Sequence, residues 1–220
     1  MFALKTGPRR LFVLFLALLL GLVFLAAPIF ASGGAVLPAS QAPLGYTLKQ
    51  AAAITAYFNE GPHTANTLPQ GFPFQILYTK PDDPTNTFRV GLGTTFYVPI
   101  VFQDNAPPLP GGYFPNINDP KAVSDYYFNP EPLGAKYIEI VVDGVVTRLS
   151  PEYVVGAATP GLPSGGSAYT VAAAFLSRMS AGTHSVIIRA RFQSEALKDP
   201  TFGLPDGVFE FSIPYTVIVR

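Results

Sequence analysis

Few side chains in this sequence are of the types that carry enzymatic chemistry. The chain has no cysteine and two histidines, His63 and His184. A thiolate nucleophile is therefore excluded, and two histidines so far apart make no usual zinc site unless carboxylates complete it. The Gly-x-Ser-x-Gly pattern of serine hydrolases is also missing, and residues 163–167 are typical of a loop. His63 follows a Gly-Pro pair and is expected in a solvated turn.

Carboxylates are the remaining candidates for catalysis, since any two of the 14 acidic residues could meet in the folded chain. Two carboxyl groups flanking a sugar form the catalytic pair of most glycoside hydrolases. Glu139 and Glu210 fall on the polar faces of two expected strands and could serve that purpose. A solvated strand face explains both residues more simply.

Oxygen ligands gather in the region 116–125. Calcium prefers such carboxylate and amide oxygens, and the candidate ligands are Asn116, Asn118, Asp119 and Asp125. Their spacing fits no EF-hand loop, so calcium is a secondary hypothesis beside ordinary turn chemistry. No other cofactor is expected.

Aromatic side chains gather in the same part of the chain. Residues 104–135 are rich in Pro, Asn and Asp, which predicts a long loop. Aromatic rings presented by a loop can stack on sugars or anchor a protein partner. The predicted ligand-binding residues are Tyr113, Phe114, Tyr126, Tyr127 and Phe128. The simpler alternative is that these rings fix the loop to the rest of the domain.

Strand patterns dominate the elements that would position these residues. The expected strands are 74–79, 94–102, 136–142, 145–149, 168–176, 183–192 and 208–219. Pro99 lies inside the second of them, and a proline there predicts a sheet edge or a bulge. Asp143-Gly144 supplies the positive φ angles of a tight turn, so the third and fourth strands are expected to form a hairpin.

One short helix is expected near the start of the domain. Thr47 and Gln50 have the spacing of a capping box, and the alanine-rich stretch after them favours a helix that ends at Gly61. Many short strands with one helix predict a mainly β protein, with a single β-sandwich domain over residues 47–220.

His184 stands at the start of the expected strand 183–192, on the same face as its apolar residues. Gly182-Thr183-His184-Ser185-Val186 resembles the Gly-x-Tyr-x-Val corner of immunoglobulin-like sandwiches, with His184 in the tyrosine position. Bacterial secreted modules of this type often carry Gly-Thr-(Tyr/His)-x-Val. The resemblance covers the last third to half of the chain. It implies an antiparallel sandwich with His184 as a structural corner residue, and it implies no activity.

The first 33 residues are typical of a secretory signal peptide. A basic start with Arg9 and Arg10 precedes the apolar run 11–27 and small residues near Ala31. An uncleaved membrane anchor is the alternative, because the run approaches spanning length. Residues 34–46, rich in proline and small side chains, predict a linker. We therefore expect a periplasmic, cell-surface or extracellular protein.

Charge and composition limit the classes of molecule that this protein is expected to bind. Removal of the signal would leave 14 acidic against 11 basic residues, a net charge of −3. Without a basic stripe, nucleic acid is not an expected partner. The sequence predicts an exported, non-enzymatic binding or structural module with a glycan or protein partner. The alternatives are an extracellular carbohydrate-active hydrolase that uses carboxylates, or a membrane-anchored accessory subunit, which would require the signal to stay uncleaved.

Overall fold

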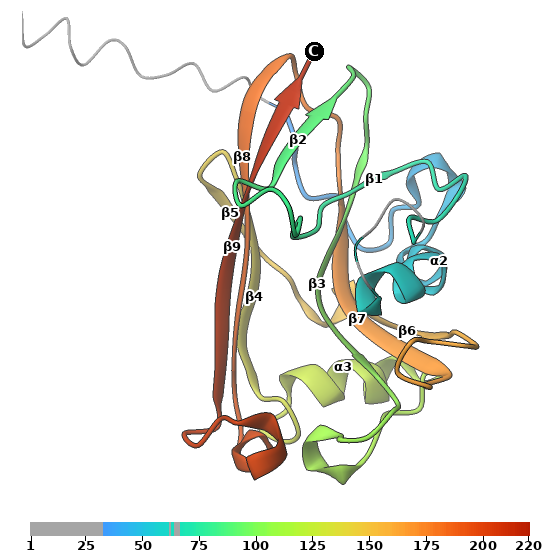
Figure 1. Cartoon of the computed structure of the whole chain (residues 1–220), viewed down its shortest axis with the longest axis vertical. Coiled ribbons are helices and arrows are strands. Elements are labelled where there is room, and N and C mark those ends of the chain that lie inside the picture. Colours follow the sequence, from blue (N-terminus) through green and yellow to red (C-terminus); the bar gives the residue numbers. More distant parts are fainter. Residues whose placement is uncertain (1–32, 62, 64–66) are drawn as a thin grey trace, which may run out of the picture.

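Two β-sheets make up most of the computed structural model, which describes residues 33–61, 63 and 67–220 (Figure 1). The first sheet has the strand order β1-β3-β7-β6, with bounds Gln75–Ile76, Phe96–Asp104, Ala168–Leu176 and Val154–Ala158. The second has the order β2-β9-β8-β4-β5, with bounds Thr87–Val90, Val208–Val219, Gly182–Gln193, Ala135–Val142 and Val145–Arg148. The expected mainly β, sandwich-like architecture is confirmed.

The pairing of two short strands corrects the expectation of a purely antiparallel sandwich. β1 runs parallel to β3, and β2 runs parallel to β9. Both are short, and they cover only one end of their neighbours. β2 and β6 were not expected at all: β2 has only four residues, and β6 is rich in glycine and alanine.

Two local features predicted from the sequence, an irregularity at Pro99 and a tight turn at Asp143-Gly144, are confirmed. The register of β3 against β7 shifts between Pro99 and Val101, so β3 carries a bulge where the proline removes a donor. β4 and β5 form the expected hairpin, in which Asp143 and Gly144 have φ angles of 48° and 84°. Positive angles at both central positions match the right-handed twist of the flanking strands.

Helix α2, Leu48–Glu60, begins with the expected capping box at Thr47 and Gln50 and ends at Gly61. It packs against β6 and β7 of the first sheet. This cover explains why almost every residue of β7 is buried, since one face meets α2 and the other meets the core between the sheets.

A second helix, α3 (Pro120–Phe128), corrects the expectation of one helix and of an unbroken loop over 104–135. Asp119 caps its start by accepting hydrogen bonds from the backbone N–H groups of Lys121 and Ala122. Pro120 occupies the first turn, where its missing N–H group has no intrahelical role. The prolines and asparagines near this segment suggested a loop, although Asp119 and Pro120 here start a helix.

The N-terminal part of the described chain is attached to the first sheet. The Leu37 N–H donates to the carbonyl of Phe175, and the Ser177 N–H donates to the carbonyl of Ala35. This end of the expected linker 34–46 is therefore fixed to β7 rather than free. The predicted signal peptide falls almost entirely on residues 1–32, outside the described residues. Within the described ranges, no helix is long and apolar enough to cross a membrane.

Candidate ligand-binding site

The predicted aromatic ligand-binding residues separate in the structure. Tyr126 and Tyr127 lie on α3 and are completely buried, so neither can present its ring to a ligand. The Tyr127 hydroxyl lies 3.1 Å from the Thr170 hydroxyl, and burial raises the pKa of Tyr127 above its ordinary value. These two rings fix the segment to the core, as in the simpler alternative. Phe114 and Phe128 are partly buried, and Tyr113 is half exposed.

The side chains of three of the four predicted calcium ligands, Asn116, Asp119 and Asp125, already have partners in the protein. Asp119 caps α3, Asp125 forms an ion pair with Lys121, and the Asn116 side chain accepts a hydrogen bond from the Asn118 N–H. Among the described residues, no group of three or more His, Cys, Asp or Glu side chains could hold a metal ion. Calcium at this turn stays a prediction.

His184 points into the core, as its strand face predicts, with 1% of its surface exposed. Its Nε2–H group donates to the carbonyl of Ser180 at 3.0 Å, and Nδ1 lies 2.7 Å from a carboxylate oxygen of Asp143. The other carboxylate oxygen accepts from the Ser185 N–H. These contacts tie the β4–β5 turn to the start of β8.

Glu139 and Glu210 each pair with an arginine of β8. Glu139 lies 2.8 Å from Arg189, and Glu210 lies 3.0 Å from Arg191. Glu210 also accepts a hydrogen bond from the Tyr137 hydroxyl. Each carboxylate therefore belongs to its own cross-strand ion pair, and their role as a catalytic pair stays a prediction.

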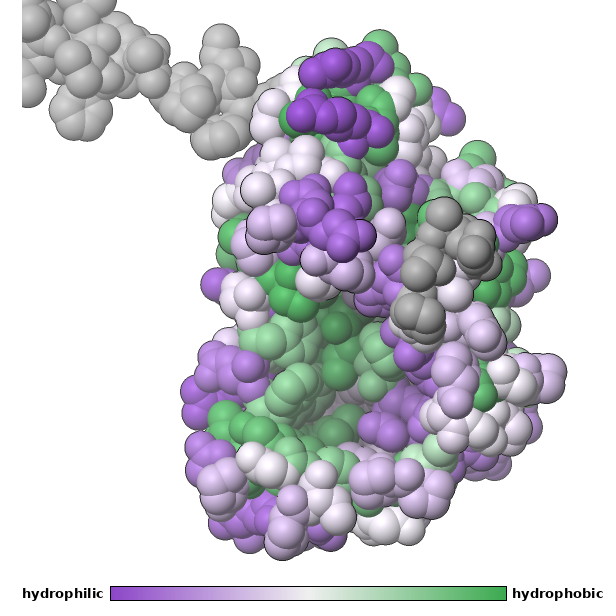
Figure 2. Space-filling view, viewed as in Figure 1, coloured by the Kyte–Doolittle hydropathy of each residue, from purple (hydrophilic) through white to green (hydrophobic). Residues whose placement is uncertain are grey.

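A cleft opens between the two sheets where the short strands β1 and β2 no longer cover their neighbours. Figure 2 shows it as a hollow with apolar walls and a hydrophilic rim. Its volume is about 340 Å³. The residues that line it are Val101, Phe102, Gln103, Pro110, Leu133, Phe192, Leu197, Phe202, Leu204 and Phe209. We call it the inter-sheet cleft.

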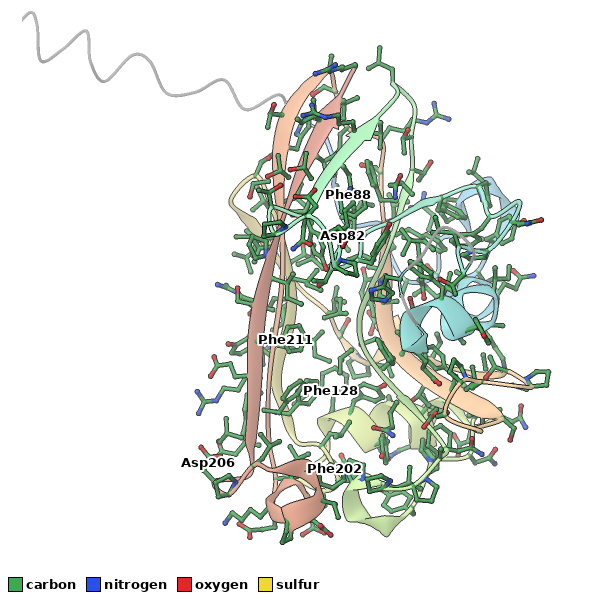
Figure 3. All side chains as sticks on the ribbon, viewed as in Figure 1. Asp82, Phe88, Phe128, Phe202, Asp206 and Phe211 are labelled. Atoms are coloured by element: carbon green, nitrogen blue, oxygen red, sulfur yellow. The ribbon has the colours of Figure 1, made fainter. Side chains whose placement is uncertain are left out.

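The inward face of β9 shows why the cleft is open. Every second residue points inward, and Tyr215, Val217 and Val219 are buried where β2 runs alongside. Beyond the end of β2 the same face continues with Phe209, which is 41% exposed, and with the partly exposed Phe211 and Ile213. Figure 3 shows Phe211 and Phe128 in this space and Phe202 at its lower end.

The free edge of β9 also carries unpaired backbone groups. The N–H groups of Thr216 and Arg220 donate to Asn86 and Val90, so even-numbered residues of β9 direct their backbone groups away from β8. Glu210 and Ser212 therefore direct theirs to the open edge, where no strand of the described residues pairs with them.

Proline limits how far this edge can pair. Pro214 has no N–H group, and its carbonyl accepts a hydrogen bond from the Asn86 side chain. The opposite wall of the cleft is β3. Its pairing with β1 ends at Tyr97, and Pro99 follows two residues later. The two facing edges are therefore open at one end only.

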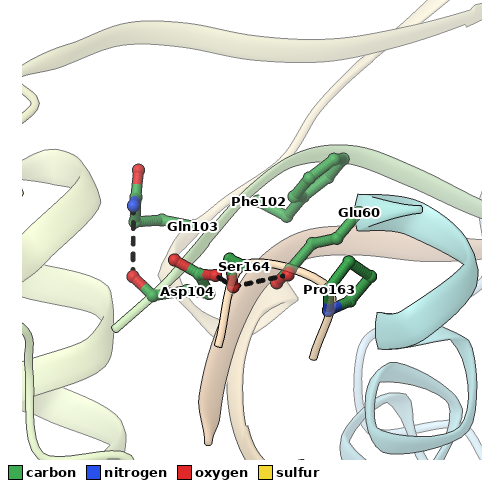
Figure 4. A pocket seen from close by; sticks show the side chains of 6 residues that line it. All are labelled: Glu60, Phe102, Gln103, Asp104, Pro163 and Ser164. Carbon is green, nitrogen blue, oxygen red and sulfur yellow. Dashed lines mark hydrogen bonds between the residues drawn. The ribbon is translucent and has the colours of Figure 1, made fainter. Parts of the chain in front are cut away.

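A second pocket, of about 450 Å³, lies next to the cleft and shares Phe102 and Gln103 with it (Figure 4). Besides Gln103, its polar residues are Glu60 at the end of α2, Asp104 at the end of β3, and Ser164 in the loop between β6 and β7. The Ser164 hydroxyl contacts both carboxyl groups, at 3.2 Å from Glu60. Pro163 is the sixth lining residue, and we call this pocket the acidic pocket.

The carboxyl group of Glu60 holds its proton more tightly than an ordinary glutamate. Burial, followed by the nearby charge of Asp104, raises its pKa from 4.5 to about 7. One of its oxygens, Oε1, is buried and has no hydrogen-bond partner among the residues that the structure describes. Such a group can keep or release a proton near neutral pH.

Neither pocket was predicted from the sequence. Phe209 and Phe211 were assigned correctly to an inward strand face, but the alternation gives no sign that part of this face lacks a cover. Glu60, Asp104 and Ser164 are far apart in the chain and carry no motif. Only the meeting of α2, β3 and the β6–β7 loop brings them together.

Comparisons with known proteins add little. No protein-family model matches the chain, and no curated protein matches it. Among solved structures, a chain described as "Solution Structure of Amebosin" aligns with a TM-score of 0.25 and 12% identity, over 67% of this chain and 99% of that one. A likeness this slight carries no argument about fold or function.

Proposed function

We propose that this protein is an exported, non-enzymatic binding module that holds an extended apolar segment of a partner protein in the inter-sheet cleft. The observation that carries the proposal is the uncovered inward face of β9. The strand keeps its apolar alternation through Phe209, Phe211 and Ile213, although in the described part of the chain no strand pairs with the edge of β9 opposite β8 at these residues. A contiguous exposed apolar surface with a polar rim is typical of an interaction site.

The size and lining of the cleft suit such a ligand. Binding pockets commonly enclose roughly 300–1,000 Å³ and are lined by apolar and aromatic side chains. Phe192 and Leu197 form buried parts of the wall, while Phe102 and Phe209 stand partly exposed at its mouth. A bound apolar side chain would cover these two rings and remove their surface from water.

The backbone of β9 favours a peptide over other apolar ligands. Glu210 and Ser212 offer both N–H and C=O groups at the open edge, and another extended backbone can satisfy both kinds of group. An acyl chain could fill the apolar space but would leave these groups to water. A short added strand beside residues 208–213 would place alternate side chains in the cleft.

The proposal also includes export of the protein and an immunoglobulin-like type of sandwich. The basic start and apolar run within residues 1–33 support export to the cell envelope or the extracellular space. We also include the immunoglobulin-like type of the sandwich. The contacts of His184 support it, because the ring bonds to backbone just upstream, as the corner tyrosine of that fold does.

Binding experiments with matched variants test this function. We expect the purified protein to select, from a library of short peptides, those with apolar residues at alternate positions. Phe209→Glu should weaken that binding by about tenfold or more, since a carboxylate in the apolar cleft costs more than 1.4 kcal/mol to desolvate. Val145→Glu is the control, because Val145 is 69% exposed on β5, at the other edge of the same sheet.

The same experiment distinguishes peptides from the other classes of ligand. Binding of polysaccharides but not of peptides, unaffected by Phe209→Glu, would replace the peptide proposal with a glycan-binding module. Binding of fatty acids alone would indicate an acyl-chain carrier. Failure of every peptide, or equal binding by the Phe209→Glu variant, would contradict the proposal.

The acidic pocket favours one alternative, a hydrolase that uses carboxylates. An acid with a pKa near 7 suits proton transfer at neutral pH, and Glu60 has that property. Release of reducing ends from a polysaccharide, abolished by Glu60→Gln, would support this enzyme. Absence of turnover over a broad panel of polysaccharides would favour the binding module.

A further inference from the structure

The hydrogen bonds around Ser164 require a proton on one of the two carboxyl groups of the acidic pocket. A serine hydroxyl donates one hydrogen bond and accepts two. The Ser164 oxygen accepts from the Gly166 N–H at 3.1 Å, and it contacts a carboxyl oxygen of Glu60 and one of Asp104. With one proton of its own, the hydroxyl can donate to only one of these two carboxyl groups.

The remaining contact is favourable if one carboxyl group carries a proton, which it can donate to Ser164 or directly to the other carboxyl group, because Glu60 and Asp104 are also hydrogen-bonded to each other. The Asp104 carboxyl already accepts from the backbone N–H of Ala106 at 3.0 Å. Among the described residues, no backbone N–H group donates to the Glu60 carboxyl, and its Oε1 is buried without a partner. Either arrangement places the proton on Glu60, and one that satisfies all three groups has Glu60 donating to Ser164 while Ser164 donates to Asp104.

Within the described part of the chain, no cationic group neutralises this pair. The charged neighbour of Glu60 is Asp104 from β3, and the β6–β7 loop supplies the Ser164 hydroxyl. From β7 the nearest titratable group is Tyr169, which is buried and accepts a hydrogen bond from the Asn59 side chain on α2. Loss of the shared proton would therefore place two negative charges against each other.

We propose that Glu60, Ser164 and Asp104 form a proton-dependent latch that holds the tip of the β6–β7 loop against α2 and β3. With the proton in place, the chain of hydrogen bonds closes the latch. Without it, the Glu60–Ser164 contact becomes repulsive and residues 163–166, the loop tip, separate from the end of α2. The latch does not depend on what the inter-sheet cleft binds.

The base of the loop should stay in place when the latch opens. The Asn105 side chain accepts from the N–H groups of Ser167 and Ala168, at 2.7 and 3.0 Å. None of these groups titrates. The change should therefore be confined to the loop tip and the C-terminal turn of α2.

Burial raises the pKa of Glu60 to about 7, which sets the pH range of the switch. The native state binds this proton more tightly than the unfolded chain, so the stabilisation is complete below about pH 4.5. It is lost as the pH rises through about 7. The melting temperature should fall across this range in the wild-type protein.

Amide hydrogen exchange between pH 5 and 9 tests the latch. We expect the Gly166 amide, relative to the Ser167 amide, to lose protection with a midpoint near pH 7. Glu60→Gln keeps a donor for Ser164 and has no titrating proton, so its Gly166 amide should stay protected throughout. Ser164→Ala should lose protection at every pH.

Two results would overturn the proposal. One is a Glu60 carboxyl resonance that titrates near pH 4.5, which would mean that no shared proton exists at neutral pH. The other is equal pH dependence of Gly166 protection in the wild-type protein and in Glu60→Gln. Both measurements use the folded full-length chain and need no ligand, so their failure is independent of the proposed binding function.

Discussion

At the scale of single residues, the chemistry of this protein lies in positions that no short motif marks. His184 stands out in the sequence because histidine is rare, and the structure uses it inside the fold. Glu60 resembles any helix-terminal glutamate in the sequence, although the structure gives it an unusual proton affinity. Burial and partners from distant parts of the chain make this difference, and neither can be deduced from residue type.

His184 should be important for stability. His184→Ala removes a buried ring and its two polar contacts, with Asp143 and with the Ser180 carbonyl, so we expect it to lower the free energy of unfolding by about 2–4 kcal/mol. His184→Tyr should still fold, because a tyrosine hydroxyl can reach backbone at such a corner. Chemical denaturation of both variants measures this. An unchanged midpoint for His184→Ala would contradict the structural role.

At the scale of elements, strand prediction succeeded where a residue pattern was strong. The expected ranges 168–176 and 208–219 coincide with β7 and β9, and Asp143-Gly144 marked its hairpin correctly. The Pro99 bulge followed from a missing donor. Local rules suffice in these cases, because alternation and turn chemistry act between close neighbours.

The elements that the sequence did not predict lack a strong local pattern. β2 and β6 are short, and their places depend on pairing with β9 and β7. Helix α3 lies in a segment whose prolines and asparagines suggest a loop, and Tyr126 and Tyr127 hold it to the core. Tertiary packing, rather than local propensity, determines these segments.

The start of α3 offers a test at this scale. Asp119 accepts two backbone hydrogen bonds at the helix start, so Asp119→Ala should lower the free energy of unfolding by about 1 kcal/mol. Lys121→Ala is the control, because its ion pair with Asp125 is exposed and contributes little. Denaturation with calcium and with chelator also tests the predicted metal site. Equal stability of Asp119→Ala and the wild-type protein would refute the capping role.

At the scale of the whole molecule, the sandwich is closed at one end and open at the other. β1 and β2 cover the closed end, and the inward face of β9 is buried there. At the open end, Phe209 remains exposed above a buried floor of Phe192 and Leu197. Pro99 and Pro214 limit pairing along both free edges, which protects the molecule from indiscriminate strand addition. An open end of limited length favours a short, specific partner segment.

The most direct test of this account is amide hydrogen exchange at Glu210 and Ser212, measured with and without a saturating peptide from the binding screen. We predict that both amides become protected in the complex, because the bound segment pairs with the free edge of β9. The exposed amides of the β4–β5 turn should not change. If the peptide binds while the amides of Glu210 and Ser212 exchange as in the free protein, strand addition in the inter-sheet cleft is contradicted.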